Sequence, residues 1–345
     1  MTKVYVGMSG GVDSSLTAAL LKEQGYDVTG VYMKNWTQDL PGMKCPWADD
    51  LADAKRVAVQ LGIDFKVFDF ENEYKHKVVD YMIDEYTLGR TPNPDIMCNQ
   101  EVKFKLFLEA ALEDGADMIA TGHYARVEDG LLKMAVDTNK DQTYFLYRIT
   151  SRALQKTLFP LGEFTKPQVR EMAKERGLFT AAKKDSQGIC FVGKVGIREF
   201  LSQYVEQHPG SIIDKRTGKI LGTHDGAIFY TLGQRHGLEL GGGLPYYVVG
   251  KDMDKNEVYV TTDLNDDTLW RSSVTLTSAH WITRRPVNGE YQIRVRHRAK
   301  LISATVKITD NDVSLEFSDS ERAIAAGQSV VIYDGLVCIG GGIVA

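Results

Sequence analysis

The stretch "GMSGGVDSSLTAALL", from Gly7 to Leu21, decides the fold of the N-terminal part of the chain. It follows the short apolar run "KVYV" and places two adjacent glycines before an apolar helical pattern. Glycines let a backbone approach an anion closely, and the helix that follows presents free N–H groups and the positive end of its dipole. Ser9, Ser14 and Ser15 add hydroxyl donors. The stretch therefore predicts a strand, a phosphate-binding loop and a helix.

Short β-rich runs and longer helical patterns alternate through the first third of the sequence, which is typical of parallel βαβ units in an α/β fold. Pro92 and Pro94 interrupt the alternation. Because proline cannot continue a helix or a central strand, we expect residues 91–98 to form a loop of fixed shape. We expect strands at 3–8, 27–33, 64–70 and 117–121, and helices at 14–24, 49–61, 73–88, 103–113 and 165–176.

The last third of the sequence has a different residue pattern. Glycine-punctuated β segments begin near residue 211, and from about residue 273 onward the pattern is all strand. Six or so short strands separated by turns predict a small β-barrel. One of these segments, Arg284 to Lys300, carries five arginines and one lysine against one glutamate, a local balance of +5 in a chain of net charge -5. We interpret it as a local basic face on the barrel.

Composition narrows the class of protein. The 345 residues predict two or three compact domains, and 43% apolar with 25% charged residues is typical of a globular protein. No apolar run approaches the roughly 18 residues that cross a bilayer, and no signal-peptide core is visible, so we expect a cytoplasmic protein without a membrane segment. Four cysteines form neither a disulfide scaffold nor a C-x-x-C metal pair.

The phosphate loop lacks the lysine of a Walker loop, G-x-x-x-x-G-K-[ST]. "SGGVDS" instead resembles the loop of the N-type ATP pyrophosphatases, in which ATP is cleaved between the α and β phosphates and the loop holds the departing pyrophosphate. Asp13, an acid inside such a loop, is suited to bind Mg²⁺ or to orient a neighbour. An ordinary glycine turn before a helix is the alternative.

Two further residues are candidates for the nucleotide site. In an open parallel sheet, ligands bind at the carboxyl ends of the strands where the winding reverses. If the strand at 117–121 lies beside the first strand, Gly122 faces the nucleotide. Met33, at the end of the second strand, would then edge the adenine, although a methionine in a strand would by itself be assigned to the core.

The cysteines differ in their surroundings. "NPDIMCN" places Cys98 three residues after Asp95 in the proline-fixed loop, and "DSQGICFVG" places Cys190 behind a glycine in a second irregular segment. Cysteines in loops near polar groups are better candidates for reactivity than cysteines in strands. Cys338 is therefore predicted to be a core residue, whereas the surroundings of Cys45 are ambiguous and assign it neither a reactive nor a core role.

Seven motifs together resemble the tRNA-specific 2-thiouridylase family over nearly the whole chain: "GMSGGVDSS", "TPNPDIMCNQEVKF", "TGHYAR", "KDQTYFLYRI", "FPLGEFTKPQVREMA", "DSQGICFVG" and "YTLGQRHGL". The resemblance implies a doubly wound, Rossmann-like (HUP-type) ATP-binding domain over 1–195. A small central domain that contacts tRNA would follow over 196–270, and a tRNA-binding β-barrel over 271–345. It also implies an enzyme that uses ATP and Mg²⁺ to 2-thiolate the wobble uridine of the tRNAs for Lys, Glu and Gln, and we expect this enzyme to be a monomer.

The resemblance assigns roles residue by residue. It implies that Cys98 is the nucleophile and Cys190 the persulfide carrier, and Asp95 is a candidate general acid or base, with loop capping as an open alternative. A tyrosine is expected where this chain has His297, although imidazole can also stack on a base.

ATP binding is implied for Gly7, Met8, Ser9, Gly10, Gly11, Val12, Asp13, Ser14, Met33 and Gly122. Contact with the target base is implied for Asn93, Pro94 and Asp95, and contact with tRNA for His123, Lys140, Asp141, Gln142, His297, Arg298 and Gln328.

The implied chemistry explains these residue types. A uracil carbonyl oxygen leaves poorly, so transfer of AMP to the 2-oxygen makes it a good leaving group that sulfur can displace at carbon. A persulfide on Cys190 delivers the sulfur in place, loaded by a cysteine desulfurase or a sulfur-relay protein. Attack by Cys98 then releases hydrosulfide or leaves a disulfide that a reductant must reopen. The rivals are an amide-forming synthetase that adenylates a carboxylate, and a nonenzymatic tRNA-binding or sulfur-carrier protein.

Overall fold

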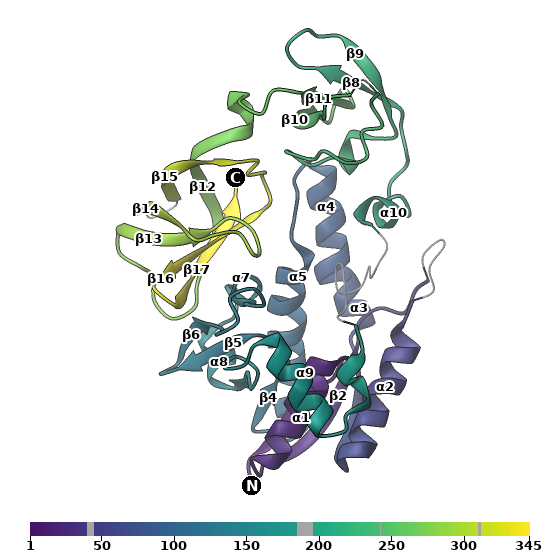
Figure 1. The fold of residues 1–345 in the computed structure, drawn as a ribbon, viewed down its shortest axis with the longest axis vertical. Coiled ribbons are helices and arrows are strands. Elements are labelled where there is room, and N and C mark those ends of the chain that lie inside the picture. Colours follow the sequence, from purple (N-terminus) through teal and green to yellow (C-terminus); the bar gives the residue numbers. More distant parts are fainter. Residues whose placement is uncertain (40–44, 185–195, 242, 310–311) are drawn as a thin grey trace.

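The computed structural model describes residues 1–39, 45–184, 196–241, 243–309 and 312–345. They build three sheets, each in its own part of the molecule (Figure 1). An α/β unit lies at the end of the long axis where the N-terminus is, a four-stranded sheet lies at the opposite end, and a β-barrel lies to one side. No helix in the described ranges has the length and apolar character needed to cross a membrane.

The N-terminal sheet has five parallel strands in the order β3-β2-β1-β4-β7. The chain winds outward from β1 in one direction to β3 and then returns to the other side of β1 with β4, so the winding reverses between β1 and β4. This confirms the doubly wound parallel sheet, and the pairing of β1 with β4 meets the condition on which the placement of Gly122 depends. The strands are β1 (Lys3–Gly7), β2 (Asp27–Lys34), β3 (Asp64–Asp69), β4 (Met118–Ala120) and β7 (Thr157–Leu158).

Helices connect and cover these strands. Each predicted helix is present, although most ends are shifted and the helix predicted at 73–88 consists of α3, η1 and α4. The first part of the set is α1 (Val12–Glu23), α2 (Trp47–Leu61), α3 (Glu71–Tyr74), the π-helix η1 (Lys75–Asp80), α4 (Tyr81–Thr87), α5 (Pro94–Met97), the π-helix η2 (Cys98–Leu106) and α6 (Phe107–Glu113). The remainder is α7 (Thr143–Leu146), α8 (Ser151–Gln155), α9 (Lys166–Glu175) and the 3-10 helix η3 (Phe179–Ala182).

The prediction of a loop over residues 91–98 is wrong in its second half. A helical segment begins at Pro94 and continues through α5, η2 and α6. Proline is tolerated there because the first helical residue needs no intrahelical N–H bond. The Asn93 side chain caps this end by accepting a hydrogen bond from the Ile96 N–H at 3.3 Å. Cys98 therefore lies within a helical segment rather than in a loop.

The central part of the chain forms a sheet in the order β10-β11-β8-β9, in which only the β8–β11 pair is parallel. Val258, Val260 and Ile212 form its buried side. Its elements are α10 (Ile197–Leu201), β8 (Gly210–Asp214), β9 (Ile220–His224), η4 (Ala227–Phe229), β10 (Tyr247–Asp252), β11 (Glu257–Thr261) and η5 (Asp267–Leu269).

The last six strands close into a barrel, as predicted, because β12 pairs with both β15 and β17. Leu315, Val306 and Ile332 are among the residues that fill its interior. The barrel strands are β12 (Trp270–Trp281), β13 (Gly289–Arg294), β14 (Ile302–Ile308), β15 (Val313–Arg322), β16 (Ser329–Asp334) and β17 (Val337–Val344).

A hairpin from the N-terminal unit extends the barrel sheet. β5 (Ala125–Glu128) and β6 (Leu131–Met134) pair with each other, and β6 pairs with β17 at Lys133 and Val337. Arg294 of β13 also forms a buried ion pair with Asp141 of the N-terminal unit at 2.8 Å. The prediction that the whole Arg284–Lys300 stretch forms one basic face is therefore wrong for Arg294, whose charge is neutralised inside the protein.

Candidate functional site

The phosphate loop has the geometry that its sequence predicts. Gly10 adopts a φ of 71°, and a Cβ at this position would lie 2.5 Å from the backbone oxygen of Asp50, so only glycine fits. The next glycine, Gly11, is the N-cap of α1 and makes no side-chain cap hydrogen bond. The first N–H groups of α1 are thus left for a ligand, and they favour an anion.

Serine hydroxyls line the start of α1. Ser14 Oγ accepts a hydrogen bond from the Ser9 N–H at 3.2 Å and lies 3.4 Å from Ser9 Oγ. Ser15 Oγ donates to the Gly11 oxygen at 2.7 Å. These hydroxyls can rotate toward an incoming phosphate without a change in the backbone.

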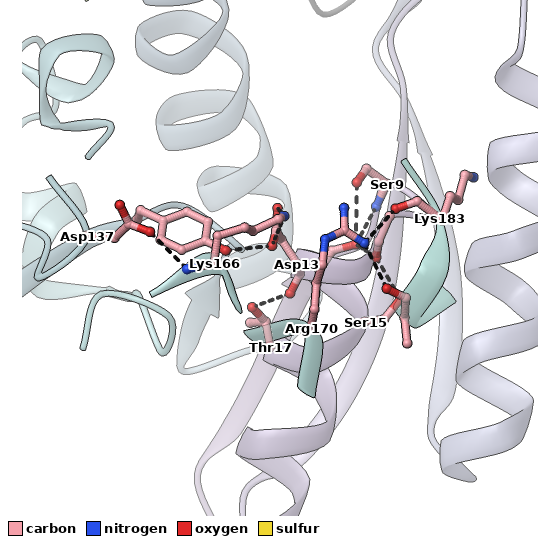
Figure 2. A network of polar contacts seen from close by, with 12 residues as sticks. Ser9, Asp13, Ser15, Thr17, Asp137, Lys166, Arg170 and Lys183 are labelled. Atoms are coloured by element: carbon pink, nitrogen blue, oxygen red, sulfur yellow. Dashed lines mark hydrogen bonds and ion pairs between the residues drawn. The ribbon is translucent and has the colours of Figure 1, made fainter. Parts of the chain in front are cut away.

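A lysine from a distant part of the chain reaches the loop. Lys166, the first residue of α9, donates to both carboxylate oxygens of Asp13 at 2.7 and 2.8 Å (Figure 2). The Tyr124 hydroxyl donates to the same carboxylate at 2.9 Å. The ammonium group that the loop itself lacks is therefore present beside it, paired with the acid of the loop.

Two further cations, Lys183 and Arg170, lie on the other side of the loop (Figure 2). Lys183 contacts Asp50 at 2.9 Å and Asp53 at 2.7 Å, next to Gly10. Burial lowers the pKa of Lys183, but the hydrogen bonds to the two carboxylates outweigh burial and leave the pKa above its usual value. Arg170 of α9 donates to the backbone oxygen of Lys183 at 3.0 Å.

The sequence reasoning missed Lys166, Arg170 and Lys183. The signal was weak, because each lies about 150 residues or more from the loop, and a lysine at a helix start is common. The one indication in the sequence is that Lys166 lies in the run "TKPQVREMA".

Gly122 and Met33 lie where the prediction placed them relative to the loop. A Cβ at Gly122 would come within 3.0 Å of Asp13 C and Ser14 N, so the chain after β4 passes directly against α1. A Cβ at Gly7 would lie 3.0 Å from Met33 Cε. The predicted nucleotide residues therefore form one continuous patch at the carboxyl ends of β1, β2 and β4.

His123, the next residue, points into the protein. Its ring packs against Phe104 at 5.6 Å and Phe159 at 6.2 Å, and its Nδ1 lies 2.8 Å from Thr121 Oγ1. Burial, with the charge of Lys103 as the second cause, holds the pKa of His123 well below its usual value. The side chain is neutral and interior, so the implied contact with tRNA has no exposed imidazole here to make it.

Cys98 is buried, with 1% of its surface exposed, at the first position of η2. Asp95 lies in the first turn of α5, where a carboxylate stabilises the positive end of a helix, so its structural role stays open beside acid–base chemistry. Cys190, the implied persulfide carrier, lies outside the described residues. Cys338 is core, as predicted, and Cys45 is also buried.

The segment that leads into Asn93 meets all three parts of the protein. The Thr91 N–H donates to the Ala326 oxygen of the barrel at 2.8 Å, and its hydroxyl donates to Thr231 Oγ1 of the central part at 3.2 Å. A Cβ at Gly327 would lie 2.8 Å from the Thr91 nitrogen. Thr91, two residues before Asn93, therefore lies where the α/β unit, the central part and the barrel meet.

Comparison with known proteins fits this arrangement. Three family models match consecutive parts of the chain: a tRNA methyl transferase HUP domain over residues 2–194, a tRNA methyl transferase PRC-barrel domain over 198–262 and an aminomethyltransferase β-barrel domain over 271–344. The tRNA-specific 2-thiouridylases of Bacillus cytotoxicus and Bacillus anthracis are each 49% identical to this chain over 348 residues, covering 99% of it and 94% of the relative. The chain belongs to the tRNA-specific 2-thiouridylase family. A more distant solved structure, the U34-tRNA thiolase NcsA of Methanococcus maripaludis, is 17% identical, with a TM-score of 0.37 over 59% of this chain and 64% of that one.

The residues that the family resemblance assigns to tRNA contact differ in exposure. Asp141 is 1% exposed and binds Arg294, the Ala135 N–H and the Thr143 hydroxyl. Its carboxylate holds the barrel against the N-terminal unit rather than facing solvent. Gln142 accepts from the Tyr124 N–H at 2.9 Å, and Gln328 accepts from the Ala325 N–H at 3.3 Å.

His297 and Arg298 lie in the turn after β13, which ends at Arg294, and not in the strand that the basic pattern suggested. Arg298 is exposed, has a φ of 63° and donates to the Asn139 oxygen at 3.1 Å. The His297 ring packs on Phe145 at a centroid distance of 4.4 Å. Burial first, and then the charges of Arg298, Arg294 and Lys140, lower the pKa of His297 to about 4, so it is uncharged at neutral pH.

The described residues contain no group of three or more His, Cys, Asp or Glu side chains arranged to bind a metal ion. Asp13 could hold Mg²⁺ only together with phosphate oxygens and water, which is the usual arrangement at a nucleotide.

Proposed function

We propose that this protein is a tRNA-uridine 2-sulfurtransferase that thiolates the wobble uridine of the tRNAs for Lys, Glu and Gln, giving 2-thiouridine, AMP and pyrophosphate. One combination of features carries the proposal. The chain has a glycine loop, flanked by cations, that fits phosphate, and Cys98 follows shortly after the segment where the three domains meet. Full-length identity of 49% to curated 2-thiouridylases supports the same activity.

The nucleotide site accounts for the adenylation step. Gly10 leaves room that any Cβ would fill, and the uncapped start of α1 favours an anion, so the loop fits the phosphates of ATP. We infer that Lys166 and Lys183 turn from their carboxylate partners toward the phosphates. Asp13 would then be released to hold Mg²⁺, whose charge offsets that of the phosphates.

The sulfur step would use the two cysteines. The Cys98 thiolate attacks the Sγ of a Cys190 persulfide, a Cys98–Cys190 disulfide forms, and hydrosulfide leaves with the outer sulfur. Hydrosulfide then attacks C2 of the adenylated base and displaces AMP. A dithiol reductant restores both thiols. Asn93, Pro94 and Asp95 would receive the extruded base, while the central domain and the exposed Arg298 of the barrel contact the tRNA backbone.

Product analysis with labelled ATP tests the reaction class. With tRNA, Mg²⁺ and a persulfide donor present, ATP should yield AMP and pyrophosphate in amounts that match the sulfur incorporated. Formation of ADP would contradict the proposal and favour a phosphotransferase. AMP formation that depends on a carboxylate substrate, and not on tRNA, would favour an amide-forming synthetase.

A further inference from the structure

One short segment, Thr143–Ile149, connects Cys98 to the barrel. On the Cys98 side it contacts the two residues that follow the cysteine. The Asn99 side chain donates to the Phe145 backbone oxygen at 3.2 Å, and Arg148 Nε donates to Gln100 Oε1. Both contacts fall on the first turn of η2, so they help to fix the position of Cys98.

The same residues contact the barrel on their other side. Arg148 Nη1 donates to the Ser278 backbone oxygen in β12 at 2.8 Å, and the Phe145 ring packs on His297. The Ile149 backbone oxygen lies 3.0 Å from His280 Nε2. The guanidinium group of Arg148 therefore links Ser278 in barrel strand β12 to Gln100, which lies two positions after Cys98.

Two features of this connection are unfavourable when each is taken alone. Ser278 has a φ of 49°, a left-handed conformation that is unfavourable for serine, and it lies in a register shift of β12 between Thr277 and His280. Asn99 Oδ1 is buried and has no hydrogen-bond partner within the described part of the chain. An arrangement with such costs can change when a ligand supplies compensating contacts.

We propose that Arg148 is a positioning residue that keeps Cys98 buried in the free protein by holding the first turn of η2 against the barrel. The inference rests on the proposed role of Cys98 as the nucleophile. Cys98 is 1% exposed in this arrangement, and a thiol must be reached by a second sulfur atom to react. His297, whose ring packs on Phe145, makes a second barrel contact with the same segment.

Alkylation of Cys98 by iodoacetamide, followed by mass spectrometry of its peptide, tests this proposal in the free protein. It needs neither ATP nor a sulfur donor, so its outcome is independent of whether thiolation itself is observed. Arg148→Ala should raise the rate at Cys98 by about tenfold, the factor that loss of one hydrogen bond to a charged group gives in a local opening equilibrium. His297→Ala should raise it as well, and Arg148→Lys should give an intermediate rate.

Two controls separate positioning from general loosening. Arg152→Ala removes an exposed arginine from α8, four residues along, and should leave the rate at Cys98 unchanged. Cys338, buried in β17 with 2% exposure, reports on the barrel in every sample and should stay unreactive. A wild-type rate at Cys98 in Arg148→Ala or His297→Ala would overturn the proposal. So would parallel increases at Cys98 and Cys338, because they would mean that the whole interface had opened.

Discussion

Replacing Cys98 by serine should lower the rate of tRNA thiolation by about 10³-fold or more, the scale of losses seen when a covalent nucleophile is removed. Serine keeps the size of the buried side chain at the start of η2, but its hydroxyl is scarcely ionised at neutral pH and cannot accept sulfur from a persulfide. Thiolation is measured as 2-thiouridine formed per tRNA with ATP and a persulfide donor in excess.

A matched substitution makes this result specific. Cys338→Ser changes an equally buried thiol in the barrel and should retain full thiolation. AMP formation should also persist in Cys98→Ser, because adenylation uses the phosphate loop and not the thiol. If Cys98→Ser thiolates tRNA at the wild-type rate, the sulfur relay through this residue is wrong.

Lys166→Ala should give the second largest effect, a loss of about 10- to 100-fold in kcat/KM for ATP, as expected when a charged hydrogen-bond donor to phosphate is removed. Lys166 is the ammonium group that reaches Asp13 in the phosphate loop, and no lysine of the loop can replace it. The measurement is ATP-dependent AMP formation at several ATP concentrations, together with inhibition by pyrophosphate, which should weaken in the same variant.

Lys174→Ala provides the control on the same helix. Lys174 pairs with Glu171 on the exposed face of α9, so its loss should leave both kinetic constants and pyrophosphate inhibition unchanged. Lys166→Arg keeps the charge and should recover part of the activity. An unaltered kcat/KM in Lys166→Ala would show that the lysine serves only to neutralise Asp13 in the nucleotide-free protein.

Local patterns were enough to predict the phosphate loop and the sheet. Gly10 and the apolar runs around it fix a strand, a turn and a helix through interactions between near neighbours in the sequence. The place of Gly122 was predicted only on the condition that the strand at 117–121 lies beside the first strand, and the pairing of β4 with β1 meets that condition. The closure of the barrel followed from the strand pattern of the last third.

Contacts between distant segments were not predictable in this way. Lys166 looks like an ordinary helix-start residue until the fold brings it to Asp13. Arg294 reads as part of a basic surface because its partner, Asp141, lies 153 positions away and on another domain. The error at Pro94 is local instead, because Asn93 followed by a proline is also the pattern of a helix start, with Asn93 as the N-cap and Pro94 as the first helical residue.

The most direct test of the proposed function is mass spectrometry of the nucleosides from an unmodified glutamate tRNA incubated with the protein, ATP, Mg²⁺ and a persulfide donor. The proposed mechanism predicts 2-thiouridine at the wobble position, formed only when ATP is present. A tRNA that returns with an unmodified wobble uridine under these conditions, while the protein consumes ATP, would contradict it.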